Sequence, residues 1–373
     1  MSDQLLRSAN AVCDLDAEID SLLAGPVGAA NPADDQATRL RAMVAGSGGP
    51  SPAATSLAAA EAVLRSVLER REIDRARERA QSRTHLARVV AVASGKGGVG
   101  KTNIAVNLAA AMAARGLRVI LLDADLGTAN ADVLCGLTPT ARLDHVVTPL
   151  PLHDGAAISI SDILVDAPGG FRLAPGSAGI ARMADLTPGE QRQMLELLGE
   201  LERDADVLVV DTGAGVGRSV TTMLHAADLG LVVATPEPTS MADAYALLKC
   251  LVLSEEHEWS PGSAEALRMV INQSVDSGEA EDVHARLTAV CGRFLGIRPK
   301  LLGSIAQDLR VAQAVRARCP LVLYAPECPA ARHMVLLASR LIDQLGVRVS
   351  QSRPNASPGF RAALARILLR RHS

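Results

Sequence analysis

Aromatic side chains, cysteine pairs and long apolar runs are scarce or missing in this sequence. Only 2% of its residues are Phe, Trp or Tyr, which leaves few side chains on which single-stranded nucleic acid could stack. The six cysteines include no C-x-x-C pair, so neither a zinc site nor an iron–sulfur site is indicated. No stretch approaches the roughly 18 apolar residues of a membrane span, and the first residues lack the apolar core of a signal peptide. We therefore expect a cytoplasmic protein without a membrane-spanning segment.

The chain nevertheless contains ample material for a hydrophobic core. It has 373 residues, of which 48% are hydrophobic and 21% are charged, and these proportions exclude disorder as the dominant state. The formal net charge of -3 argues against a protein built around a nucleic-acid-binding surface. The length fits either two domains or one α/β domain with appendages.

Composition divides the chain into four parts. Residues 1–45 predict two short helices, the second of which starts at Asn31 and Pro32. Residues 46–87 predict a Gly/Pro/Ser linker followed by an Arg-rich helical spacer. Residues 88–349 predict the main domain, and residues 350–373 predict a second linker with a helical tail.

In the main domain, short apolar runs alternate with segments of helical periodicity. The runs are RVVAVAS, RVILLDAD, DVLVVDTG, LGLVVATP, RMVIN and LLGSIA. Such strands, buried on both faces and separated by helices, predict an α/β fold with a mainly parallel, doubly wound sheet and helices on both faces. Ligands of these folds bind at the carboxyl ends of the strands, so the residues that follow the runs are the candidate site.

A phosphate-binding loop follows the first predicted strand. It satisfies the pattern G-x-x-x-x-G-K-[ST] and consists of Gly95, Lys96, Gly97, Gly98, Val99, Gly100, Lys101 and Thr102. The glycines allow backbone amides to surround phosphate oxygens, while Lys101 can reach the β- and γ-phosphates and the Thr102 hydroxyl can bind Mg²⁺. The loop therefore predicts binding of a nucleoside triphosphate with magnesium.

The same residues also match the dinucleotide fingerprint G-x-G-x-x-G, with Asp123 about as far downstream as a ribose-binding acid. Two features favour the triphosphate. Lys101 and Thr102 would serve no purpose beside a pyrophosphate that takes no metal, and the predicted strand at residues 207–211 ends in Asp211, an acid suited to Mg²⁺. We therefore predict that Thr102 and Asp211 hold the magnesium ion.

A second lysine inside the loop points to a family. K-G-G-V-G-K-T, preceded by Gly95 and containing Lys96, resembles the deviant Walker A motif of the MinD/ParA ATPases. The resemblance implies hydrolysis of ATP to ADP and phosphate, an ATP-dependent homodimer, and a catalytic role for Lys96, which would reach across the dimer to the partner's ATP. The alternative for Lys96 is simple exposure to solvent.

The resemblance implies roles for residues that follow two other strands. Asp125, with Asn130 nearby, would lie in switch I and orient the attacking water. Asp211 would end the Walker B strand, and the sequence D-T-G-A-G would place Gly213 and Gly215 in switch II. Glycines there allow the backbone to follow the γ-phosphate, although a tight turn would need them equally.

Two further positions concern the nucleotide base and the strand ends. By the resemblance Asn272 would read the adenine amino group, whereas an Asn after a strand is by itself more typical of a turn. A proline is expected after the last strand, but residues 305–308 read Ile-Ala-Gln-Asp, which leaves the contacts on the far side of the base open. Asp123 is interpreted as a hydrogen-bond acceptor at the end of a strand.

Within this family the chain is most similar to the flagellar-number ATPases FlhG, also called FleN or YlxH. The similarity rests on DADLGTANADVLCGL, DTGAGVG and TPEPTSMADAYALLK, and on a D-Q-A-x-x-L-R element formed by Asp35, Gln36, Leu40 and Arg41 with their neighbours. It implies two classes of partner, the SRP-type GTPase FlhF and flagellar switch-complex proteins. Gln36 would help to order the catalytic water of FlhF, and Leu40 and Arg41 would dock the helix. The alternative is a capped surface helix.

The tail predicts an amphipathic helix. Phe360, Leu364, Ile367 and Leu368 fall on one helical face, with arginines beside or opposite it. Such a helix is typical of contact with an anionic membrane surface, and a single short copy binds weakly, so a dimer would strengthen the attachment. The alternative is that the helix packs on the domain's own surface.

The leading hypothesis is a cytoplasmic ATPase switch that is monomeric with ADP. With ATP it would dimerise and lie on the inner face of the cell membrane, where it would regulate flagellar number or placement through FlhF. The alternatives are a ParA-type ATPase of DNA or cargo partitioning, an iron–sulfur carrier of the same broad group, and a metabolic enzyme.

Overall fold

The computed structural model describes residues 86–125, 130–143, 160–176, 188–253, 265–347 and 359–369. The expected N-terminal helices, with Asp35, Gln36, Leu40 and Arg41, and the spacer at residues 46–84 lie outside these residues. The elements in chain order are β1 (Arg88–Ser94), α4 (Lys101–Ala113), β2 (Val119–Ala124), α5 (Ala131–Leu134), α7 (Ile160–Ile163), β3 (Val165–Asp166), β4 (Arg172–Ala174), α9 (Pro188–Arg203), β5 (Val207–Ala214), α10 (Arg218–Ala226), β6 (Leu229–Ala234), α11 (Pro238–Val252), β7 (Leu267–Ser274), α13 (Ser277–Phe294), β8 (Lys300–Ala306), α14 (Leu309–Arg316), α15 (Leu321–Tyr324), α16 (Pro329–Leu345) and α17 (Phe360–Leu369).

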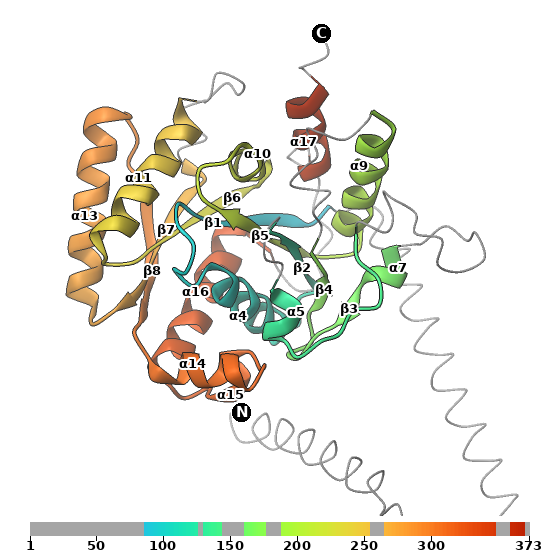
Figure 1. Cartoon of the computed structure of the whole chain (residues 1–373), viewed down its shortest axis with the longest axis horizontal. Coiled ribbons are helices and arrows are strands. Elements are labelled where there is room, and N and C mark those ends of the chain that lie inside the picture. The colour runs from blue at the N-terminus through green and yellow to red at the C-terminus, as the bar shows by residue number, and fades with distance from the viewer. Residues whose placement is uncertain are drawn as a thin grey trace, which may run out of the picture. The chain divides into compact units, whose positions relative to one another are not determined.

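The strands form a sheet with the order β3-β4-β2-β5-β1-β6-β7-β8 among the described residues. All neighbours pair in parallel except the edge strand β3, which is antiparallel to β4. β1 lies between β5 and β6 (Figure 1), so the loop after β1 emerges near the middle of the carboxyl edge. The predicted α/β fold with a mainly parallel sheet is confirmed.

Each central strand contributes side chains to two cores. In β1, Val89 and Ala91 face one core and Val90 and Val92 face the other, as expected when successive side chains of a strand alternate between faces. Helices α4 and α16 pack together on one face, while α10, α11 and α13 pack on the other (Figure 1). Burial on both faces explains why the strands read as nearly continuous apolar runs.

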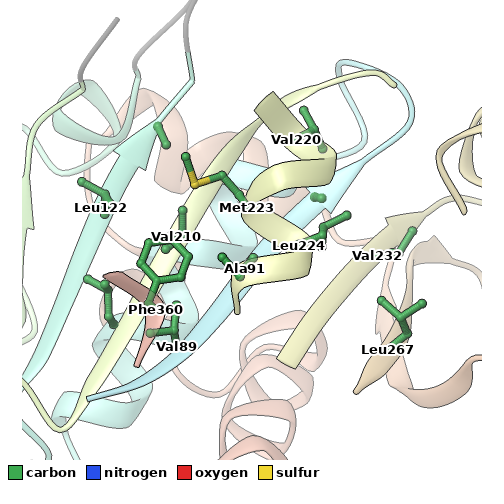
Figure 2. Packing of buried hydrophobic residues seen from close by; sticks show 14 of the residues in the cluster. Val89, Ala91, Leu122, Val210, Val220, Met223, Leu224, Val232, Leu267 and Phe360 are labelled. Atoms are coloured by element: carbon green, nitrogen blue, oxygen red, sulfur yellow. The ribbon is translucent and has the colours of Figure 1, made fainter. Parts of the chain in front are cut away.

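The C-terminal helix α17 is part of one of these cores. It packs on α9 and α10, and its Phe360 and Leu364 side chains are 2% and 0% exposed. Figure 2 shows Phe360 beside Val89 and Val210. Phe360 and Leu364 are therefore buried, although the membrane hypothesis expects them to be exposed. For these two residues the structure agrees with the alternative, in which the helix packs on the domain's own surface. The side chains of Ile367 and Leu368 lie outside the described part.

Two residues of α9 shape the place where α17 begins. The Glu202 carboxylate accepts hydrogen bonds from the backbone N–H of Phe360 (2.5 Å) and of Arg361 (3.0 Å), so it caps a helix that starts 158 residues later. A Cβ atom at Gly199 would lie 2.7 Å from the Arg361 side chain, and glycine therefore permits the close crossing of α9 and α17. Burial raises the pKa of Glu202.

None of the described helices combines the length and the apolar character needed to cross a bilayer.

Replacing Phe360 tests whether α17 is an integral part of the domain. Phe360→Ala should lower the free energy of unfolding by about 3–5 kcal/mol, because it leaves a cavity between α17 and the sheet. The matched control is Leu309→Ala, since that side chain is 85% exposed and its loss should change stability by about 0.5 kcal/mol or less. Urea unfolding followed by circular dichroism measures both, and equal midpoints for the two variants would contradict the packing described here.

Candidate nucleotide site

The phosphate loop lies between the end of β1 and the start of α4. Gly98 and Gly100 adopt left-handed backbone conformations, with φ of 83° and 88°, which favour glycine. A Cβ atom at Gly95 would overlap the backbone of Asp243 on α11, so packing also requires a glycine there. The loop is thereby held where its amides and the N-terminus of α4 can receive an anion.

Lys101 and Asp211 form a buried ion pair beside this loop. Nζ of Lys101 lies 2.5 Å from Oδ1 of Asp211 and 3.9 Å from Oδ2 of Asp125. The Lys101 and Asp211 side chains are 6% and 0% exposed. Burial raises the pKa of Asp211, and the charge and hydrogen bond of Lys101 oppose that rise. The first residue of α4, a residue of β5 and the residue that follows β2 are thus brought together at the carboxyl edge of the sheet.

The second carboxylate oxygen of Asp211 is a candidate metal ligand. Oδ2 is buried and has no hydrogen-bond partner among the described residues, which costs about 1–3 kcal/mol unless a water or a cation meets it. Hydrogen bonding from Thr102 also acts on this carboxyl group and lowers its pKa. Mg²⁺ prefers carboxylate, hydroxyl and water oxygens, so Thr102 and Asp211 fit the ion for which the sequence predicts them.

Asp123 anchors both ends of the segment that contains the predicted switch I. Its carboxylate accepts hydrogen bonds from the backbone N–H of Asp125 (3.2 Å) and of Ala131 (3.1 Å), which confirms its interpretation as an acceptor. Asp123 also lies opposite Asp211 in the register of β2 and β5. Burial and the Asp211 charge raise its pKa to about 6. Residues 126–129 between the two anchors lie outside the described part.

The two predicted switch segments adjoin at Asp125. A Cβ atom at Gly213 would lie 3.6 Å from Oδ1 of Asp125, which is ordinary van der Waals contact. The N–H of Gly215, whose φ is 102°, donates to the carbonyl of Ser94 at 2.8 Å. Asn130 is exposed at the start of α5, where its side chain makes no capping hydrogen bond. The end of β5 therefore lies beside Asp125, and the residue that follows it lies beside the end of β1.

Lys96 lies at the rim of the loop and pairs with α11. Its Nζ lies 3.1 Å from Oε2 of Glu237 and 3.0 Å from Oγ1 of Thr239, and 38% of the Lys96 side chain is exposed. The sequence interpretation missed Glu237 and Thr239. The available signal was their place directly after β6, at the same carboxyl edge as the phosphate loop.

Asn272 also reaches the phosphate loop. Its Nδ2 donates to the carbonyl of Val99 at 2.7 Å, and a Cβ atom at Gly100 would collide with the same amide group. The next residue, Gln273, has a φ of 59°, a conformation that costs a side chain energy and often marks a functional edge. The structure thus places Asn272 beside the loop, while its contact with adenine stays a prediction.

The turn after β8 lacks the expected proline and is held by side-chain hydrogen bonds. The N–H of Ala306 donates to Nδ1 of His333 on α16 at 3.1 Å, and Asp308 caps α14 by accepting from the N–H of Arg310 at 2.9 Å. The turn after β8 is therefore fixed by the side chains of His333 and Asp308.

Removing the cation from the buried pair tests the electrostatics of the site. Lys101→Met should destabilise the nucleotide-free protein by about 3–5 kcal/mol at pH 8, because Asp211 is left as a buried carboxylate without its cation. Without Lys101, the folded-state pKa of Asp211 in the variant lies further above the unfolded value. The loss of stability should therefore shrink as the pH falls, because Asp211 becomes protonated and no charge remains buried. The double variant Lys101→Met/Asp211→Leu should recover most of the stability. Chemical unfolding at several pH values measures these changes, and a loss independent of pH would refute this account of the pair.

Comparisons with known proteins agree with this geometry. The family model described as "ParA: NUBPL iron-transfer P-loop NTPase" matches residues 85–342. Over 232 residues the chain is 41% identical to the antiactivator FleN of Pseudomonas aeruginosa, which covers 62% of this chain and 78% of that protein. It is 30% identical over 258 residues to the flagellum site-determining protein YlxH of Helicobacter pylori, covering 69% of this chain and 82% of that protein.

Among solved structures, the septum site-determining protein MinD of Pyrococcus horikoshii in complex with Mg-ADP is similar in fold. It has a TM-score of 0.52 at 19% identity and covers 70% of this chain and 98% of that one. The phosphate loop, the buried Lys101–Asp211 pair and the extra Lys96 lie within the range matched by the family model. The chain therefore belongs to the ParA family of P-loop NTPases, as an ATPase of the MinD type that resembles FlhG and FleN.

Proposed function

We propose that this protein is an ATP-driven dimeric switch that regulates the number or placement of flagella. The observation that supports a dimeric switch is the position of Lys96. This residue belongs to the phosphate loop, but its ammonium group contacts Glu237 and Thr239 at the rim of the loop. The flagellar assignment is supported by the similarity to proteins named antiactivator FleN and flagellum site-determining protein YlxH.

Each residue of the site has a role in hydrolysis under this proposal. The backbone of residues 95–100 and the Lys101 side chain bind the phosphates, while Thr102 and Asp211 would hold Mg²⁺, which would supply positive charge to the phosphate oxygens. Asp125 orients a water for attack on the γ-phosphorus, and the bond from that phosphorus to the bridging oxygen of ADP breaks. Asn272 contacts the adenine.

Lys96 would exchange partners when two chains meet. An exposed ion pair such as Lys96–Glu237 contributes only about 0–1 kcal/mol, so little free energy is lost when it opens. In the dimer the freed ammonium group would meet the phosphates of the partner's ATP, where charge develops in the transition state. Dimerisation would thus be coupled to hydrolysis.

The Lys96→Ala variant tests this coupling. It should bind ATP like the wild type, because Lys101 and the loop amides remain, yet it should stay monomeric and hydrolyse ATP at least tenfold more slowly. Asp125→Ala should instead accumulate the ATP-bound dimer, since water is no longer oriented. Light scattering after size exclusion, with ATP or ADP, measures the oligomer.

The matched control is Lys300→Ala, which removes an exposed lysine where β8 begins, at the opposite edge of the sheet. It should leave both dimerisation and turnover unchanged. Normal ATP-dependent dimers of Lys96→Ala would remove Lys96 from the mechanism.

We also propose that α17 leaves its docked position in the ATP state and attaches the dimer to the inner face of the cell membrane. α17 packs on α10, and α10 begins at Arg218, three residues after Gly215 of the predicted switch II. A change in that segment would move the surface on which α17 rests. Release would free the apolar face that carries Phe360 and Leu364.

Flotation with anionic vesicles tests the release. Wild-type protein should float with ATP and remain unbound with ADP. Glu202→Gln should float partly with ADP as well, because it replaces the carboxylate that accepts from Phe360 and Arg361 with a group that can accept fewer bonds. Glu200→Gln, an exposed change on the same helix, is the control and should behave like the wild type. Absence of flotation in every nucleotide state would overturn the membrane proposal.

The partner proposals rest on the N-terminal motif and on the relatives. Asp35, Gln36, Leu40 and Arg41 match the element that resembles the FlhF-stimulating helix, so we propose that this segment stimulates GTP hydrolysis by FlhF. Flagellar switch-complex proteins are the second proposed class of partner.

A further inference from the structure

The helices α14 and α15 form an unusually exposed surface at one end of the domain. They pack against each other (Figure 1), yet Ala314 is the only buried residue of α14. We use the name α14–α15 surface for six exposed residues: Leu309, Val315, Arg316, Arg318, Leu323 and Tyr324.

The surface includes large apolar side chains that are exposed to solvent. Leu309 is 85% exposed, which is the highest value among the large hydrophobic residues described, and Tyr324 and Leu323 are 45% and 42% exposed. Leu309 and Arg316 are seven residues apart on α14, so they lie on the same helix face. An exposed apolar side chain on the same helix face as a charged one is therefore available for contact with another protein.

The charged residues between the start of α14 and the end of α15 are arginines. Residues 309–326 contain Arg310, Arg316 and Arg318 and no Asp, Glu or Lys. The acids that flank this range have partners of their own, because Asp308 caps α14 through the N–H of Arg310 and Glu327 pairs with Arg332. No ion pair links Arg316 or Arg318 to any residue in the part of the chain that the structure describes. These guanidinium groups are therefore available to carboxylates of another molecule.

The backbone at Arg318 gives an independent indication. Arg318 has a φ of 52° directly after the C-cap residue Ala317 of α14, a position where glycine or asparagine is usual. A left-handed conformation costs an L side chain roughly 1–2 kcal/mol. The turn that ends α14 therefore holds Arg318, and not glycine, at the exposed side of the surface.

From these observations we propose that the α14–α15 surface binds an acidic, amphipathic segment of a partner protein. Carboxylates of the segment pair with Arg316 and Arg318, and an apolar side chain covers Leu309. Arg and Tyr are enriched at the energetically important centres of protein interfaces. Nucleic acid fits less well, because phosphates would pair with the arginines but leave the aliphatic side chains in water. The proposal does not depend on dimerisation or on the flagellar assignment.

Fluorescence anisotropy of the full chain with two designed peptides tests this site. The first peptide is a labelled 18-residue helix with Leu at positions i, i+3 and i+7 and Glu on both flanks, and the second has Lys in place of every Glu. Wild-type protein should bind the Glu peptide and bind the Lys peptide at least tenfold more weakly. Leu309→Ser and Arg316→Glu should each weaken the Glu peptide at least tenfold, and Arg316→Glu should gain affinity for the Lys peptide.

The matched control is Phe294→Ser, which removes a 64% exposed apolar side chain that also lies beside an arginine, Arg293, but on α13. It should bind the Glu peptide like the wild type, and ATP hydrolysis should be unchanged in Leu309→Ser and Arg316→Glu. No binding of the Glu peptide, or equal losses in Phe294→Ser and Leu309→Ser, would overturn the proposal. The same assay is repeated with duplex DNA and with anionic vesicles. If either one binds more tightly than the Glu peptide and also depends on Leu309 and Arg316, the proposal of a protein partner is overturned.

Discussion

The buried ion pair between Lys101 and Asp211 is the interaction on which the candidate site depends. Lys101 begins α4 and Asp211 lies near the end of β5, so their 2.5 Å contact joins the helix after the phosphate loop to the centre of the sheet. Asp123 lies next to Asp211 in the sheet and Asp125 lies 3.9 Å from the Lys101 ammonium group. A single buried lysine therefore faces three carboxylates, and burial together with the Asp211 charge raises the pKa of Asp123. A divalent cation at Oδ2 of Asp211 would balance this negative charge. Binding of Mg-ATP would therefore be electrostatically favourable, because the site has more carboxylates than cationic side chains.

The parts of the site that follow from the sequence are those defined by local spacing. A strand, a glycine loop and a helix adjacent in the chain must adjoin in space, so residues 95–102 and the strand ends could be assigned without coordinates. Glu237 and Glu202 could not be found in this way. Glu237 contacts Lys96, which is 141 residues away in the sequence, and Glu202 contacts Phe360, which is 158 residues away. No local sequence pattern around a glutamate indicates so distant a partner. The sheet order brings these residues together, and that order is a property of the whole chain.

The tail shows why an amphipathic pattern is ambiguous. Phe360 and Leu364 would present the same apolar stripe to a bilayer or to the domain's own core. What decides in this structure is the complementary shape of α9, where Gly199 leaves room for Arg361 and Glu202 satisfies the first backbone donors of α17. These features lie on the receiving helix and not in the tail, so the tail sequence alone could not distinguish the two environments.

The docked tail also constrains any mechanism that sends it to a membrane. Phe360 lies beside Val89 and Val210 (Figure 2), and its departure would expose side chains of β1 and β5, which carry the phosphate loop and Asp211. The apolar area lost must be covered again or offset by another interaction. ATP-dependent dimerisation would supply such an interaction, because nucleotide binding favours whichever conformation it contacts more strongly. Under the proposed function, tail release would follow from the ATP-bound assembly and would be disfavoured in the isolated chain. Membrane attachment would then depend on the nucleotide without a separate signal.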